Sequence, residues 1–255
     1  MSETGWNFNN SAKNESILKP LCQAVEQHYQ LPARRLYRYF ATWEDPAFIN
    51  ARELGPQYRG FHIRFECQLM AKLPLYLREC FFRPEDELGR LEPDCPYENL
   101  VAFDDLIYIR HSTCLDPTGC TITYAHELRH VVQQDQFPRL MKATSSLRGR
   151  LKDFLNTATE LDLPAERDAN IISKRVAEQV CGVQAVRRFA EQQVMWMKTG
   201  GGLAHKQRWE FFRDVPSPTA YDWVNETVKL VESYKGRIDT GMDVSAMQWW
   251  VGPVA

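Results

Sequence analysis

Two histidines and a glutamate near the middle of the chain have the types and the spacing of a metal-dependent hydrolytic site. Residues 124–134 read Tyr-Ala-His-Glu-Leu-Arg-His-Val-Val-Gln-Gln, and the pattern H-E-x-x-H falls on His126, Glu127 and His130. Residues i and i+4 of a helix lie on one face, one turn apart, so the two imidazoles can bind a single metal ion. Glu127 lies about 100° around the helix from His126, where it can reach a water on that ion without being a ligand. The pattern therefore predicts two ligands and one general base.

The segment around this pattern has the periodicity of a helix. Its apolar side chains form one stripe, made of Tyr124, Leu128, Val131 and Val132. Thr118 or Thr121 can cap the start, and Phe137-Pro138 is expected to end the helix. The sequence thus predicts a helix over 121–136 that turns Leu128 toward the core. The alternative is an ordinary helix with two surface histidines, because a bare H-E-x-x-H match also arises by chance.

A zinc site of this type needs a third protein ligand and leaves its fourth position to water. Glu166 is the first candidate, because it stands in the first turn of a helix predicted over 163–180, where Pro164 suits the first position. Glu160, which precedes that helix, and His111, which follows a predicted strand, are the alternatives. The third ligand is therefore expected from one of these three side chains.

The predicted helix carries other polar groups beside Glu166. Asp168 is a weaker ligand candidate, because residues two apart on a helix point in different directions. The small side chain of Ala169 would allow the histidine helix to approach closely, and Asn170 can hydrogen-bond a ligand. The alternative for Glu166 itself is a solvated first-turn acid that the helix dipole favours.

The secondary structure predicted for the rest of the chain is a mixture of strands and helices in the first half and mainly helical after residue 121. Strands are predicted at 61–65 and 106–110, and a turn is predicted at 117–119. Further helices are predicted at 16–29, 36–41, 68–82, 144–158 and 182–197. These patterns give an α+β fold class in which helices predominate.

Composition divides the chain into three parts. Residues 1–14 are polar and are expected to form a flexible arm, and residues 15–198 form the main domain. A Thr-Gly-Gly-Gly break at 199–202 separates a tryptophan-rich segment, 199–255, which we expect to pack back on the core with structural aromatic side chains.

The balance of charge and hydropathy excludes several classes of function. The chain has 255 residues and a formal net charge of -2, with 44% hydrophobic and 25% charged residues. No basic stripe points to nucleic acid, and no apolar run reaches the roughly 18 residues of a membrane span. Because the first residues also lack the apolar core of a secretory signal, we expect a cytoplasmic protein, with signal-independent export as the alternative. Its seven irregularly spaced cysteines are expected to be reduced, and only Cys114 and Cys120 could meet.

The segment Ala125–Gln134 resembles the active-site helix of the zincin metallopeptidases. The downstream Glu166-x-x-Ala-Asn is similar to the second helix of the gluzincin branch, in which a glutamate completes the zinc site. The region of roughly residues 100–180 also resembles the short zincin domains of ImmA/IrrE-type regulators and of phage-tail-like systems. The resemblance implies a zincin-like domain with a small sheet packed on the active-site helix, and with 106–110 as the edge strand along the cleft. It also implies one zinc ion per chain, bound by His126, His130 and Glu166.

The activity that this resemblance implies is that of a zinc metalloendopeptidase. A zinc-activated water would hydrolyse the peptide bond of a peptide or protein substrate, with Glu127 as the general base. Manganese, cobalt or nickel would also suit the ligand set. Tyr124, Tyr221 and His205 are candidates for stabilising the oxyanion, and the sequence selects none of them, nor any oligomeric state. The alternative function is a catalytically weak or inactive zincin scaffold that binds a protein partner.

Overall fold

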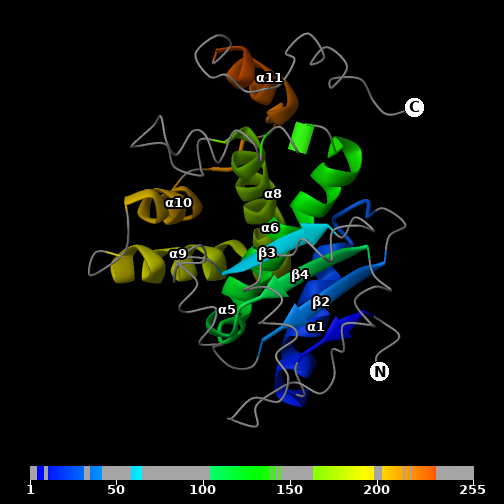
Figure 1. Cartoon of the computed structure of the whole chain (residues 1–255). Helices are drawn as coiled ribbons and strands as arrows, with labels where there is room; N and C mark the ends of the chain where they lie inside the picture. The colour runs from blue at the N-terminus through cyan, green and yellow to red at the C-terminus, as the bar shows by residue number, and fades with distance from the viewer. Residues whose placement is uncertain are drawn as a thin grey trace, which may run out of the picture. The chain divides into compact units, whose positions relative to one another are not determined.

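The structure is a computed structural model of the chain, with one small sheet among many helices (Figure 1). It describes residues 5–8, 11–31, 35–41, 59–64, 104–138, 140–141, 144, 163–197, 203–214, 216–218 and 220–233. Contacts among the residues divide the chain into two compact units, Met1–Leu128 and Arg129–Ala255. The α+β class with a predominance of helix is confirmed. The predicted division into an arm, a main domain and a tail stays a prediction as a whole.

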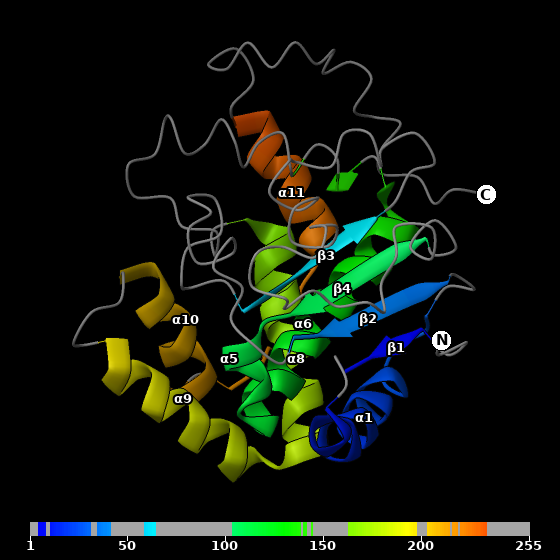
Figure 2. The same cartoon turned by 60° about the horizontal axis from the view of Figure 1, so that its bottom comes forward.

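The sheet belongs to the first unit, and within the described residues it has four strands in the order β1-β2-β4-β3 (Figure 2). The strands are β1 (Trp6–Asn7), β2 (Leu36–Phe40), β3 (Gly60–Arg64) and β4 (Asp105–Ile109). β1, β2 and β4 are parallel, whereas β3 runs antiparallel to β4. β4 therefore lies inside the sheet, and the expectation of an edge strand at 106–110 is wrong. All five residues of β4 are buried, as is typical of an inner strand, and β3 is the outer strand next to it.

One face of the sheet packs on α6 (Pro117–Gln136), the helix that carries the two histidines. The ring of Tyr124 has its centroid 5.9 Å from that of Phe40 and 6.0 Å from that of Trp6. On β3, a Cβ added to Gly60 would lie 2.9 Å from the Cγ2 atom of Thr123. The sheet therefore rests on the turn of α6 that precedes the first histidine, which confirms the predicted packing of a small sheet on this helix.

Two segments of the sheet differ from the predictions for them. Residues 5–8 contribute β1 and bury Trp6 and Phe8, so a flexible arm is wrong for these residues. The segment 36–41 was predicted to be a helix, but it contains β2. Its apolar residues are buried on both faces of the strand, and such two-sided burial can resemble helical spacing in a short run.

The start of α6 is set by an aspartate cap. The Oδ1 atom of Asp116 accepts a hydrogen bond of 2.8 Å from the backbone N–H of Gly119, and Pro117 occupies the first helical position. Both features are typical of a helix N-terminus, so the helix begins one turn before the predicted residue 121, and the turn predicted at 117–119 is wrong. Thr121 does not cap the helix, because its hydroxyl donates to the Pro117 carbonyl within it. The predicted end before Phe137 is confirmed.

The other helices are α1 (Ala12–Glu26), α5 (His111–Cys114), α8 (Pro164–Cys181), α9 (Val183–Met197), α10 (Leu203–Asp214) and α11 (Trp223–Ser233). The helices predicted at 16–29, 163–180 and 182–197 are confirmed, with small shifts of their ends. The helix predicted at 68–82 and all but Thr144 of that predicted at 144–158 lie outside the described residues. In the second unit, Trp209, Phe212 and Trp223 are buried, as expected for structural aromatic side chains.

Four cysteines fall within the described ranges, namely Cys22, Cys114, Cys120 and Cys181, and all four have free thiols. The expected meeting of Cys114 and Cys120 is confirmed, since their side chains are hydrogen-bonded without a bridge, and the reduced state of the cysteines stays a prediction. Among the helices that the structure describes, none has the length and apolar character to cross a membrane.

A buried ionic cluster joins β3 to β4. The carboxylate of Asp105 is 0% exposed, and its Oδ1 atom lies 2.8 Å from Nε2 of His62 and 3.0 Å from Nε of Arg64. Burial acts to raise the pKa of Asp105, but the hydrogen bond and charge of His62, with the charge of Arg64, outweigh it and hold this pKa below its ordinary value. The ionised carboxylate therefore stabilises the folded chain at neutral pH.

We expect Asp105→Asn to lower the free energy of unfolding at pH 7 by about 3–5 kcal/mol, because it removes one partner of a buried ion pair. A carboxyl whose pKa is lower in the folded chain stabilises it fully above the unfolded value of about 3.9, and this stabilisation is lost as pH falls through the folded value. The difference between variant and native chain should therefore shrink at low pH. Urea unfolding measured from pH 7 to pH 2 checks this.

The exposed ion pair of Arg213 and Asp214 supplies the control for this measurement. Asp214→Asn should cause little change at any pH, because water screens such a pair. Equal effects of the two substitutions would contradict the stabilising role of Asp105.

Gly60, the glycine of β3, is expected not to tolerate a larger side chain. In Gly60→Ala the new Cβ would lie 2.7 Å from the Tyr108 carbonyl oxygen as well as 2.9 Å from Thr123. The strand must shift away from α6, so we expect a loss of about 1–3 kcal/mol in the free energy of unfolding. Gly182→Ala is the comparison, because its Cβ meets nothing within 4 Å and only the positive φ of 87° is strained. A Gly60→Ala chain as stable as the native one in thermal unfolding would show that β3 does not press on α6.

Candidate metal centre

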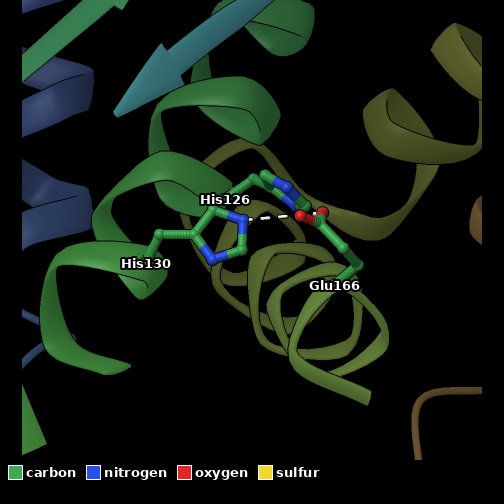
Figure 3. Close-up of side chains that lie close together, drawn as sticks. All are labelled: His126, His130 and Glu166. Atoms are coloured by element: carbon green, nitrogen blue, oxygen red, sulfur yellow. Dashed lines mark ion pairs between the residues drawn. The ribbon is translucent and has the colours of Figure 1, made fainter. Parts of the chain in front are cut away.

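The two histidines and the glutamate selected from the sequence lie together in the structure, with their side chains pointing toward one another (Figure 3). The Nε2 atom of His130 is 3.5 Å from the Oε2 atom of Glu166, and His126 stands one turn before His130 on α6. One ligand atom from each residue lies within 4.8 Å of the other two. Among the described residues, no other group of His, Cys, Asp and Glu is arranged in this way.

The side chains of this cluster are largely withdrawn from water. His126 is 5% exposed and His130 is 9% exposed, whereas Glu166 is half-buried. The interpretation of a helix with two surface histidines is therefore wrong. Glu127, on the same helix, is only 7% exposed. Because burying a carboxylate costs free energy, the position of Glu127 beside the histidines indicates a functional role for this side chain.

Glu166 reaches the histidines because α8 begins beside α6. Pro164 is the first residue of α8, so Glu166 stands in its first turn. The backbone carbonyl of Ala165 accepts a hydrogen bond of 3.0 Å from the Gln133 side chain of α6. Ala165 also packs in a buried cluster with Leu140 and Trp223. The start of α8 is thus held by one polar contact and by apolar packing, as a ligand-bearing turn requires.

Asp168 lies near this cluster but does not belong to it. Its Oδ2 atom accepts hydrogen bonds from Nε of Arg129 at 2.6 Å and from Nε2 of Gln133 at 2.8 Å. The Oε1 atom of Gln133 in turn lies 2.7 Å from Nδ1 of His130. The expectation that Asp168 points elsewhere is confirmed. Sequence reasoning missed Arg129 and Gln133, although the three-residue step from His130 to Gln133 is a usable signal for contact on one helix face.

The other candidate residues have different outcomes. His111 begins the short helix α5 and is not part of the cluster, whereas Glu160 lies outside the described residues. Asn170 is buried, but its Oδ1 atom has no hydrogen-bond partner among the described residues, so its supporting role stays a prediction.

The three candidates for the residue that stabilises the oxyanion have different surroundings in the structure. Tyr124 is fully buried, and its hydroxyl is hydrogen-bonded to Arg38 and Glu26, so it is a structural side chain. Burial, above all, raises the pKa of Tyr124 well above its ordinary value. Tyr221 is half-buried under the guanidinium group of Arg167, which lies 5.3 Å from the ring centroid. The side chain of His205 lies outside the described residues.

The donor set and its spacing fit a zinc ion. Zinc binds imidazole nitrogen and carboxylate oxygen at about 2.0–2.2 Å, which in a tetrahedron puts ligand atoms about 3.4 Å apart. The 3.5 Å between Nε2 of His130 and Oε2 of Glu166 has this value. Two imidazoles and one carboxylate also leave one position of the tetrahedron to water, as in catalytic zinc sites.

Comparisons of the chain with models of protein families, with curated proteins and with solved structures find no match. The resemblance to zincins therefore rests on the residues of the motif and on the geometry of the site.

We expect the purified protein to bind about one zinc ion per chain and His126→Ala to lose it, because two ligands no longer compensate for dehydrating the metal. Elemental analysis after dialysis measures the metal content. His28→Ala, which removes an exposed histidine of the same unit, is the control and should keep the metal. Native protein that binds no zinc when zinc is supplied would contradict the site.

The third ligand can be identified by the same measurement. We expect Glu166→Ala to lose zinc and Glu160→Ala to keep it, because the carboxylate of Glu166 lies 3.5 Å from the His130 ring. The reverse result would assign the position to Glu160.

Proposed function

We propose that this chain is a zinc-dependent metallopeptidase that hydrolyses peptide bonds in peptide or protein substrates. The observation that carries the proposal is the convergence of His126, His130 and Glu166, with a buried Glu127 on the same helix. Two imidazoles, one carboxylate and an adjacent unligated carboxylate are the parts that zinc-assisted hydrolysis requires.

In the proposed enzyme, His126, His130 and Glu166 hold the zinc ion. Bound zinc would polarise the scissile carbonyl and lower the pKa of a water to about 7. The helix keeps Glu127 off the metal, because its side chain leaves α6 about 100° around from that of His126. The carboxylate of Glu127 is then available to accept the proton of the attacking water and to pass it to the leaving amine.

The sheet supports a peptide as the substrate. Of the described strands, β3 is the outer one on the side of β4, and its first residue Gly60 abuts Thr123, one turn before His126. An extended peptide that adds to β3 as a further strand would run beside the histidine helix. β3 thus takes the role that was expected of residues 106–110.

The decisive variant is Glu127→Gln, which keeps the size of the side chain and removes its proton-accepting charge. We expect peptide hydrolysis to fall by a factor of about 10²–10⁴ while the zinc content stays unchanged. Mass spectrometry of a peptide mixture from a digested proteome, incubated with the zinc-loaded protein, measures the cleavage.

Glu191→Gln is the matched control, because Glu191 is a partly exposed helical glutamate on α9 that forms an ion pair with Arg187 four residues away. It should cleave as the native chain does. If the zinc-loaded native chain cleaves neither peptides nor unfolded proteins, the peptidase proposal is wrong, and the scaffold that binds a protein partner is favoured instead.

A further inference from the structure

Behind His130, on the side away from Glu166, lies a chain of buried polar contacts that the proposed chemistry does not use. It runs from the His130 ring to the Gln133 amide, then to the Asp168 carboxylate and the Arg129 guanidinium. Asp168 is 3% exposed and Gln133 is also buried. We propose that Gln133 is a positioning residue that fixes the tautomer and direction of His130 for metal binding, and that Asp168 and Arg129 hold Gln133. This inference rests on the proposed zinc site.

The hydrogen-bond partners determine the orientation of the Gln133 amide. Its Nε2 atom lies 3.0 Å from the Ala165 carbonyl oxygen and 2.8 Å from a carboxylate oxygen of Asp168. The backbone carbonyl oxygen of Ala165 can only accept a hydrogen bond, so the amide NH2 group must be the end that faces it. The amide oxygen is therefore the atom that faces His130.

This orientation fixes the hydrogen on the imidazole. An amide oxygen can only accept, so the Nδ1 atom of His130, 2.7 Å away, must carry a hydrogen. In the neutral ring the lone pair is then on Nε2, which is the atom that lies 3.5 Å from Glu166. The contact behind the ring thus selects the tautomer whose free nitrogen faces the other ligands, which is how partners of metal-bound histidines act.

Arg129 and Asp168 make this contact rigid. Arg129, His130 and Gln133 are on α6, whereas Ala165, Glu166 and Asp168 are on α8. The Nε atom of Arg129 donates a hydrogen bond of 2.6 Å to the same Asp168 oxygen that accepts from Gln133, so Arg129 holds this acceptor in place. The same bonds tie the first turn of α8 to α6, and they hold Glu166 at a fixed place beside the imidazole.

The test is the affinity of the full chain for zinc, measured by competition with a chelator after the metal has been removed. Gln133→Met keeps the length of the side chain and loses both hydrogen-bonding groups, and we expect its affinity to fall about 10–100-fold. Gln136→Met is the matched control, because Gln136 is exposed on the same helix, and its affinity should equal that of the native chain. The visible spectrum of the cobalt-loaded variant should also change, because the imidazole is no longer held in one direction.

A charge-conserving exchange distinguishes positioning from mere packing. In Gln133→Glu combined with Asp168→Asn, residue 133 can still accept from Nδ1 of His130, while residue 168 supplies the amide donor. The carboxylate cannot donate to the Ala165 carbonyl as the amide does, so we expect this double variant to bind zinc more tightly than Gln133→Met and less tightly than the native chain. A role confined to stability would lower the melting temperature of the metal-free protein without this recovery.

The outcomes separate the two proposals. If the native chain binds zinc and Gln133→Met binds it equally well, the positioning role is wrong while the metal site stands. Should Gln133→Met not fold, Asp168→Leu keeps the approximate size of the side chain and removes the acceptor of the Gln133 amide, and its affinity must still fall below the native value. If the native chain binds no zinc, both proposals are overturned.

Discussion

The amide of Gln133 is the contact on which the arrangement of α6 and α8 depends. It lies buried between the two helices, where every polar group needs a partner because water is excluded. The side chain meets this demand by donating to Ala165 and Asp168 of α8 and accepting from His130 of its own helix. Any displacement of α8 along α6 would break the bonds to Ala165 and Asp168 together, so the two helices have one preferred register at this contact. That register places Glu166 beside the histidines.

The first half of α6 packs on the sheet through Thr123 and Tyr124, and the polar content of this helix is unusual for a core helix. Its buried polar residues are Thr121, Thr123, His126, Glu127, His130 and Gln133. Each such group costs about 1–3 kcal/mol if it is left without a hydrogen bond. Tyr124 shows how the fold satisfies such a group for structure alone, since its hydroxyl meets Arg38 and Glu26 under the sheet. The histidine pair that faces a carboxylate on another helix is the arrangement from which the zinc site is proposed.

Local patterns predicted the parts of the fold that depend on neighbours in sequence. The helix of His126 and the helix that begins at Pro164 follow from apolar periodicity and from helix-start signals, and the i, i+4 spacing placed two ligands on one face. Glu166 could be ranked above Asp168 as a candidate ligand, because residues two positions apart on a helix point to opposite sides of it. The predictions that were wrong concern contacts between segments that are distant in the sequence. Whether 106–110 is an inner or an edge strand is decided by residues 36–40 and 60–64, which no local window contains. Gln133 was missed for the same reason, since its partner Asp168 lies 35 residues away.

The choice of an amide at position 133 follows from the charges on either side of it. A carboxylate there would face Asp168 at hydrogen-bond distance, and two like charges so close and buried repel strongly. A lysine could not accept a hydrogen bond from the imidazole. A side chain that accepts on one side and donates on the other lets Asp168 be neutralised by Arg129 alone, while Glu166, only two residues before it, remains directed at His130. Two acids on one turn of α8 thereby have different surroundings, since Asp168 accepts from Arg129 and Gln133 whereas Glu166 lies against His130.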